Sequence, residues 1–149
     1  MFEETFFLYS LGLTFDVFKI IMSFESLQCI SPKYSLKLRN FDSSFPMIIN
    51  LINHKESKIA LRYSEFEKED TILHLAGRIE WIWIDCFSKI PGDSSIYKKF
   101  KKLGFKLCFV SPELQGQEYK IKEYKEYFEY NNILIDAVCS KLINSSEWQ

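Results

Sequence analysis

Apolar residues gather in four runs that each end in polar residues, and this pattern dominates the chain. The runs cover residues 58–65, 81–87, 106–114 and 134–141. Near-continuous apolar runs are typical of strands buried on both faces, as in a parallel sheet with helices outside it. Such sheets bind ligands at the carboxyl ends of their strands, so the pattern also predicts where a site would lie.

Weaker signals between these runs complete a series of six predicted strand–helix units. We expect strands over residues 5–9, 34–41, 58–63, 80–86, 105–111 and 133–139. We expect helices over residues 14–27, from residue 44, over 69–75, from 93 or 94 to 103, and over 118–130. This spacing is the period of a β/α barrel or of an open doubly wound sheet. A complete barrel has eight units and about 250 residues, so this chain of 149 residues is about two units short.

Side-chain spacing assigns inner faces to the predicted helices. Phe15, Phe18 and Met22 give the first helix an apolar stripe, which Val17 and Ile21 widen. The spacing of Ile121, Tyr124 and Phe128 gives the last helix a core-facing side. Alternation of Trp81 and Trp83 with isoleucines places both indoles in the core between sheet and helices.

Composition narrows the class of protein. The apolar share is 47% and the aromatic share 17%, which excludes a disordered chain. Nineteen basic residues nearly balance twenty acidic ones without a basic stripe, so we expect no nucleic-acid partner. Charges interrupt the apolar runs well before the roughly 20 residues of a membrane span, and the first residues carry acid where a secretion signal carries base. We therefore expect one cytoplasmic domain over residues 1–149.

The cysteines fit the same setting. None of them forms a Cys-x-x-Cys pair, and three lie in or just after predicted buried strands, where a free thiol behaves as a small hydrophobic group. They suit a reducing compartment better than metal ligation. The four are Cys29, Cys86, Cys108 and Cys139.

Candidate binding residues lie at the carboxyl ends of the third and fourth predicted strands. Arg62 can face the mouth of a barrel and bind a phosphate or an acidic sugar, because a guanidinium forms bidentate hydrogen bonds with an oxyanion. The alternative, which we favour, is an ion pair of Arg62 with Glu65 or Asp85 that braces the barrel. Asp85 can be a metal ligand, but without neighbouring ligands a structural pairing fits it better.

Further candidates follow the last two strands. Glu113, two residues after Ser111, is the carboxylate best placed to face the mouth, and a cap on the following turn explains it equally well. Lys141 follows the last strand, where barrels often hold a phosphate, although a solvated lysine is the simpler interpretation. Asp136, inside the last strand, is expected to be a paired interior group.

Five segments at the predicted strand ends form an unusual set of motifs: Phe-Asp-Ser-Ser-Phe-Pro (41–46), Arg-Tyr-Ser-Glu-Phe-Glu (62–67), Trp-Ile-Trp-Ile-Asp-Cys-Phe (81–87), Val-Ser-Pro-Glu-Leu-Gln-Gly (110–116) and Asp-Ala-Val-Cys-Ser-Lys (136–141). Together they resemble the glycerophosphodiester phosphodiesterase-like barrels, in a bacterial branch often related to surface-polysaccharide gene sets. Their order resembles strands four to eight of that barrel, and residues 7–13 look like a degraded third strand. The resemblance implies an incomplete TIM-type barrel of about six parallel strands, the C-terminal three quarters of the family fold.

The catalytic half of the family pattern is missing from this chain. The family ends its first strand in His-Arg-Gly, and its second strand brings an acidic pair and then His-Asp, around a divalent metal. This chain has only His54 and His74, at positions that match neither motif, and Tyr9 where the branch usually has lysine. We find no metal ligands and predict no cofactor.

The sequence therefore supports two hypotheses of function. One is a truncated or degenerate phosphodiesterase-like protein without hydrolytic activity of its own, because hydrolysis needs an acid, a base and a metal. The other is an interaction or structural protein that forms a homodimer, or completes a split phosphodiesterase, through open sheet edges. The binding candidates common to both are Arg62, Glu65, Asp85, Ser111, Glu113 and Lys141.

Overall fold

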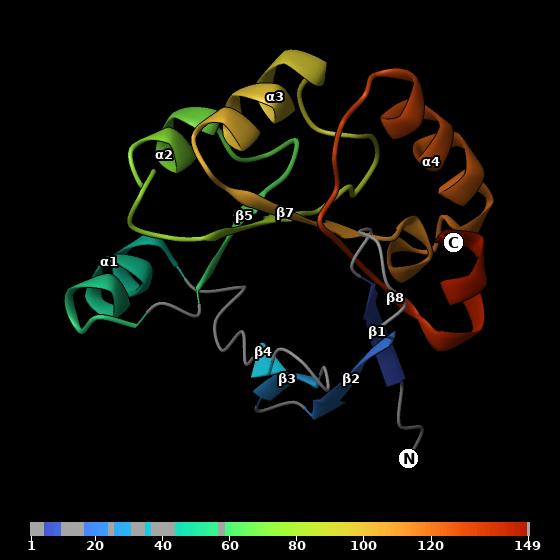
Figure 1. The fold of residues 1–149 in the computed structure, drawn as a ribbon, viewed down its shortest axis with the longest axis horizontal. Coiled ribbons are helices and arrows are strands. Elements are labelled where there is room, and N and C mark those ends of the chain that lie inside the picture. Colours follow the sequence, from blue (N-terminus) through green and yellow to red (C-terminus); the bar gives the residue numbers. More distant parts are fainter. Residues whose placement is uncertain are drawn as a thin grey trace.

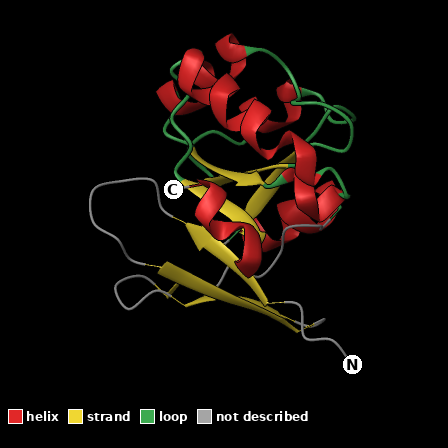
Figure 2. Ribbon diagram, turned by 90° about the vertical axis from the view of Figure 1, so that its right-hand side faces the viewer, coloured by secondary structure: helices red, strands yellow, loops and turns green. Residues whose placement is uncertain are grey.

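The computed structural model describes residues 5–9, 17–23, 26–30, 35–36, 44–56 and 59–148, and it describes the strands before residue 37 by their backbone alone. These residues form one mixed sheet with helices gathered over its parallel half (Figures 1 and 2). The strands are β1 (Thr5–Tyr9), β2 (Val17–Ser23), β3 (Ser26–Ile30), β4 (Ser35–Leu36), β5 (Ala60–Tyr63), β6 (Trp81–Ile84), β7 (Lys106–Val110) and β8 (Ala137–Lys141).

The order of the strands divides the sheet into two halves. It runs β4-β3-β2-β1-β8-β7-β6-β5. Strands β5 to β8 pair in parallel, whereas β1 pairs antiparallel with both β8 and β2, and β2 to β4 continue antiparallel. Figure 1 shows this sheet following a curved path from β5 through β7 and β8 to β1 and on to β4.

Helices α2 (Glu69–Leu73), α3 (Ser94–Lys102) and α4 (Ile121–Tyr130) connect the parallel strands, and α1 (Phe45–Asn53) precedes the first of these strands, β5. The 3-10 turns are η1 (Pro112–Gln115), η2 (Glu118–Lys120) and η3 (Leu142–Trp148). Helix α3 begins as its sequence predicts, because the Asp93 carboxylate accepts hydrogen bonds from the N–H groups of Ser95 and Ile96. Gly104, with φ of 87°, follows the end of this helix in the left-handed conformation that glycine tolerates.

The two faces of the parallel strands bury different side chains. One face packs against the helices and forms the main core; Figure 2 shows the helices on this side. Its strand residues are Leu61, Tyr63, Ile82, Ile84, Leu107, Phe109 and Val138, and its helix residues include Ile72, Tyr97, Phe100, Ile121, Tyr124 and Phe128. The last three confirm the inner face predicted for α4.

The opposite face holds the two tryptophans of β6. Trp81 and Trp83 alternate with Ile82 and Ile84, so they point away from the helices. They are nevertheless buried, as is Cys108, which pairs in register with Trp83 on the same face. The prediction that these indoles lie between sheet and helices is therefore wrong, although burial on both faces was expected correctly.

The N-terminal part departs from the expected pattern. A helix was predicted over residues 14–27, but β2 and β3 occupy residues 17–23 and 26–30. The first predicted strand exists as β1, yet it pairs antiparallel with β8. Of the strand predicted over residues 34–41, the structure describes only Ser35–Leu36, and the remainder lies outside the described residues. The described sheet thus has four parallel strands instead of six.

The α/β class is confirmed for the parallel half of the chain, where strands and helices alternate. Within the described ranges, every helix is too short or too polar to cross a membrane.

Candidate functional site

The carboxyl ends of β5 to β8 bring most of the predicted residues to one edge of the sheet. Ser64, Asp85 and Ser111 directly follow β5, β6 and β7, and Lys141 ends β8. Because these strands are parallel, their carboxyl ends meet at the same edge. The sequence therefore predicted the location of this cluster correctly.

Glu113 is the most enclosed carboxylate at this edge, with only 5% of its surface exposed. The hydroxyl groups of Ser111 and Ser140 donate to its two carboxylate oxygens, one to each. The backbone N–H of Lys141 also donates to Oε1, at 3.0 Å. Both oxygens are thus engaged by the protein itself, and Glu113 joins η1 to the end of β8.

Trp148 closes the same cluster from the C-terminal turn η3. Its indole N–H donates to Ser111 Oγ at 2.7 Å, so that hydroxyl accepts from Trp148 while it donates to Glu113. The indole is buried, and its ring centroid lies 5.5 Å from that of Phe109. We call the set Ser111, Glu113, Ser140 and Trp148 the Glu113 cluster.

Glu65 occupies a different environment, next to the loop that follows β6. Its carboxylate accepts hydrogen bonds from the backbone N–H groups of Phe87, Ser88 and Lys89 and from the Ser88 hydroxyl. Partial burial opposes ionisation of Glu65. Hydrogen bonds from its own backbone and from the 87–88 loop outweigh that effect and lower its pKa below the ordinary value.

Arg62 forms an ion pair, as we favoured, but with another partner. Its Nε donates to Glu67 Oε1 at 2.8 Å, and the other oxygen of Glu67 accepts from the Ser64 hydroxyl. Of the two partners expected from the sequence, Glu65 or Asp85, Glu65 is wrong, because the loop after β6 holds its carboxylate. Hydrogen bonds from Arg62 and Ser64 to Glu67 thus stabilise the 62–67 segment at the end of β5.

Asp85 is nearly buried, with 8% of its surface exposed, and its Oδ1 accepts a hydrogen bond from the Gln115 amide at 3.0 Å. This contact joins the end of β6 to η1. In the described part of the chain, no group of three or more His, Cys, Asp and Glu side chains is arranged to hold a metal ion. The hydrogen bond to Gln115 agrees with the structural interpretation of Asp85.

Three further residues lie away from the edge or contribute little side-chain chemistry to it. Asp136 precedes β8 instead of lying inside it, and Lys101 Nζ donates to both of its carboxylate oxygens, at 2.6 and 2.7 Å. Its pairing was predicted correctly. His54 and His74 are exposed at the ends of α1 and α2, where a ring nitrogen of each lies near a backbone carbonyl one turn earlier.

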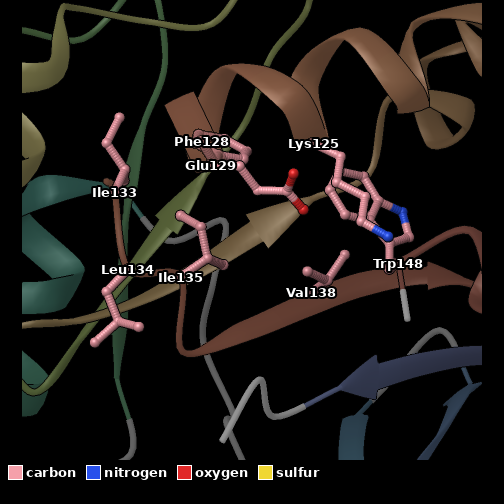
Figure 3. A pocket seen from close by; sticks show the side chains of 8 residues that line it. All are labelled: Lys125, Phe128, Glu129, Ile133, Leu134, Ile135, Val138 and Trp148. Atoms are coloured by element: carbon pink, nitrogen blue, oxygen red, sulfur yellow. The ribbon is translucent and has the colours of Figure 1, made fainter. Parts of the chain in front are cut away.

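A hollow of about 180 Å³ lies on the helix side of β8, between α4 and η3 (Figure 3). Its walls are mostly apolar, with a lysine and a glutamate on α4. The lining residues are Lys125, Phe128, Glu129, Ile133, Leu134, Ile135, Val138 and Trp148. None of the predicted binding residues lines it, and Trp148 is the residue that it shares with the Glu113 cluster.

Several residues that shape the edge gave no signal in the sequence. Ser88, Gln117 and Lys120 lie in loops and turns, and they meet because Gln117 Nε2 and Lys120 Nζ donate to the carbonyls of Phe87 and Ser88. Trp148 lies 37 residues after its partner Ser111. Loop conformation decides these contacts, and no local pattern of residues encodes them.

Comparison with known proteins leaves the family open. The chain matches no protein-family model, no curated protein and no solved structure.

Proposed function

We propose that this chain is a degenerate relative of the phosphodiesterase-like barrels, without hydrolytic activity of its own, whose carboxyl-edge polar groups serve structure and binding. The resemblance of residues 62–67, 81–87 and 110–116 to that family motivates the proposal. The proposal includes a correspondence of β5 to β8 with the last strands of such a barrel. The arrangement of Glu113 is the observation that supports it best.

Metal-dependent hydrolysis of a phosphodiester needs carboxylates that are free to bind the metal, and a group that protonates the leaving alkoxide. Glu113 is the carboxylate that the sequence places best to face the mouth of a barrel. Both of its oxygens accept hydrogen bonds from hydroxyl or N–H donors inside the protein. These bonds occupy three of the roughly four lone-pair sites of the carboxylate, and the side chain is only 5% exposed, so the geometry favours a structural role for Glu113.

The proposal predicts no turnover of a generic phosphodiester. Bis(4-nitrophenyl) phosphate should be incubated with the purified chain and with Mg²⁺, Mn²⁺, Ca²⁺ or Zn²⁺ in turn. We expect release of nitrophenol at the rate of the metal alone. The Glu113→Gln and Asp85→Asn variants serve as matched controls and should give that same background rate.

A wild-type rate that exceeds background and is lost in Glu113→Gln or Asp85→Asn contradicts the proposal. Loss in one variant alone then identifies the carboxylate that serves catalysis. A rate that exceeds background and is retained in both variants also contradicts it and locates the activity elsewhere in the chain.

A further inference from the structure

The loop after β6 directs several hydrogen-bond donors towards a single point. The backbone N–H groups of Phe87, Ser88 and Lys89 lie 3.2, 2.6 and 3.4 Å from carboxylate oxygens of Glu65, and the Ser88 hydroxyl lies 2.8 Å from Oε1. Successive N–H groups that converge in this way form a concave anion-binding nest. We call residues 87–89 the anion loop.

A carboxylate uses these donors unevenly. Oε1 of Glu65 receives three of the four hydrogen bonds, and Oε2 receives only the one from Phe87. The contacts from Phe87 and Lys89, at 3.2 and 3.4 Å, are at or beyond the long end of the usual range of about 2.7–3.2 Å. An anion with three oxygens on one face distributes four donors better than a flat carboxylate with two.

The anion loop is held from its other side, independently of Glu65. Gln117 Nε2 donates to the carbonyl of Phe87 at 2.5 Å, and Lys120 Nζ donates to the carbonyl of Ser88 at 2.7 Å. Carbonyls fixed in this way keep the adjacent N–H groups oriented when the carboxylate leaves. The donors are therefore preorganised, which reduces the cost of binding an anion.

Charge and access also suit an external anion. Lys120 and Lys89 bring positive charge to the loop, and the Arg62 guanidinium lies 5.9 Å from the centroid of the Phe87 ring. Phe87, Ser88 and Lys89 are exposed to solvent. Asp85 and Glu67 oppose these cations, so the hydrogen bonds of the loop carry most of the selectivity.

We propose that the anion loop is a binding site for a tetrahedral oxyanion, of the phosphate or phosphate-monoester class, and that Glu65 closes it as an internal ligand. Because Glu65 is tethered, it competes at high effective concentration and lowers the affinity for a free anion. An arriving phosphate displaces the carboxylate and releases the 64–67 segment from the anion loop. The proposal does not depend on whether the chain hydrolyses phosphodiesters.

The test is titration calorimetry with inorganic phosphate on the wild-type chain and on Glu65→Ala, Glu65→Gln and Glu129→Ala. Glu129→Ala removes the same charge from an exposed position of α4 and is the matched control. We expect Glu65→Ala to bind phosphate at least tenfold more tightly than the wild type, and Glu129→Ala to equal the wild type. Glu65→Gln keeps one acceptor oxygen for the loop. If Glu65→Ala does not fold, the phosphate affinity of Glu65→Gln is compared with that of the wild type instead, and it should also be higher.

Amide NMR spectra recorded during the titration locate the bound anion. We expect the largest shifts at the N–H groups of Phe87, Ser88 and Lys89. The same titration is repeated with glycerol phosphate and with acetate. Binding of both inorganic phosphate and glycerol phosphate indicates that the natural ligand is a terminal phosphate of a larger molecule. Binding of inorganic phosphate alone indicates the free ion. A folded Glu65 variant without tighter binding, shifts centred elsewhere, or equal affinity for acetate would overturn the proposal.

Discussion

Glu113 and Glu65 are the same side chain at the same edge of the sheet, in opposite surroundings. Glu113 is 5% exposed and takes two buried hydroxyl groups and one N–H. Glu65 is half-buried and takes N–H groups from an exposed loop. A carboxylate that follows a buried strand can therefore hold the fold together, as Glu113 does, or can occupy an exposed group of N–H donors, as Glu65 does.

The largest expected difference between the two carboxylates is in stability. Glu113→Ala leaves two buried hydroxyls and the Lys141 N–H without their acceptor, and each such loss costs about 1–3 kcal/mol. Because the hydroxyls can rotate towards other acceptors, we expect a total loss of about 3 kcal/mol in the free energy of unfolding. Urea denaturation followed by circular dichroism measures it. Glu65→Ala should lose less than half as much, and equal losses would mean that Glu65 is as important to the fold as Glu113.

A smaller difference in stability is expected between variants of the serines that donate to the two carboxylates. Ser111→Ala removes the donor to Glu113 and the acceptor of the Trp148 indole in a fully buried place, so we expect a loss of about 2 kcal/mol. Ser88→Ala removes one hydroxyl from an exposed loop and should change stability by no more than about 0.5 kcal/mol. The same denaturation experiment compares them. A loss in Ser88→Ala that matches Ser111→Ala would mean that the anion loop is as essential as the cluster.

The smallest effect is a pH dependence specific to Glu65. Its pKa in the folded chain lies below the ordinary value of 4.5, so the ionised form is favoured by folding. The resulting stabilisation is fully present above that ordinary value and is lost as the pH falls through the folded pKa. Thermal denaturation of the wild type and Glu65→Gln from about pH 7 down to about pH 3 should show the difference shrinking at the acid end. A difference that stays constant over this range would show that ionised Glu65 is not what the loop stabilises.

The parallel half of the fold could be predicted because its signals are redundant. Strand β6 is a continuous apolar run, and helix α3 has its Asp93 cap and its terminal glycine in sequence. Residues 14–27 lack such signals. Phe18, Ile21 and Met22 fit one face of a helix, but the segment is also rich in residues that favour strands, and antiparallel pairing with β1 and β3 decided between the two.

The sequence predicted where the polar residues gather, but it did not predict most of the contacts between them. Parallel strands bring Asp85 and Ser111 to one edge regardless of detail. Which carboxylate meets which donor depends on loop paths, and the sequence therefore did not predict the ion pair of Arg62 with Glu67. It offered mouth and cap interpretations for Glu113 equally, and tertiary contacts with Ser140 and Lys141 resolved them towards a buried link.

The position of β1 has a consequence for the order of folding. Its register with β8 joins Phe6 to Lys141, so the contact that connects the two halves of the sheet closes nearly the whole chain. Contacts between such distant residues form slowly, because the entropy of closing the intervening chain must be overcome first. The antiparallel strands can assemble early during synthesis, but they gain their attachment to the parallel half only when β8 has left the ribosome. Until then the edge of β1 that β8 later covers is open to chaperones and to other nascent chains.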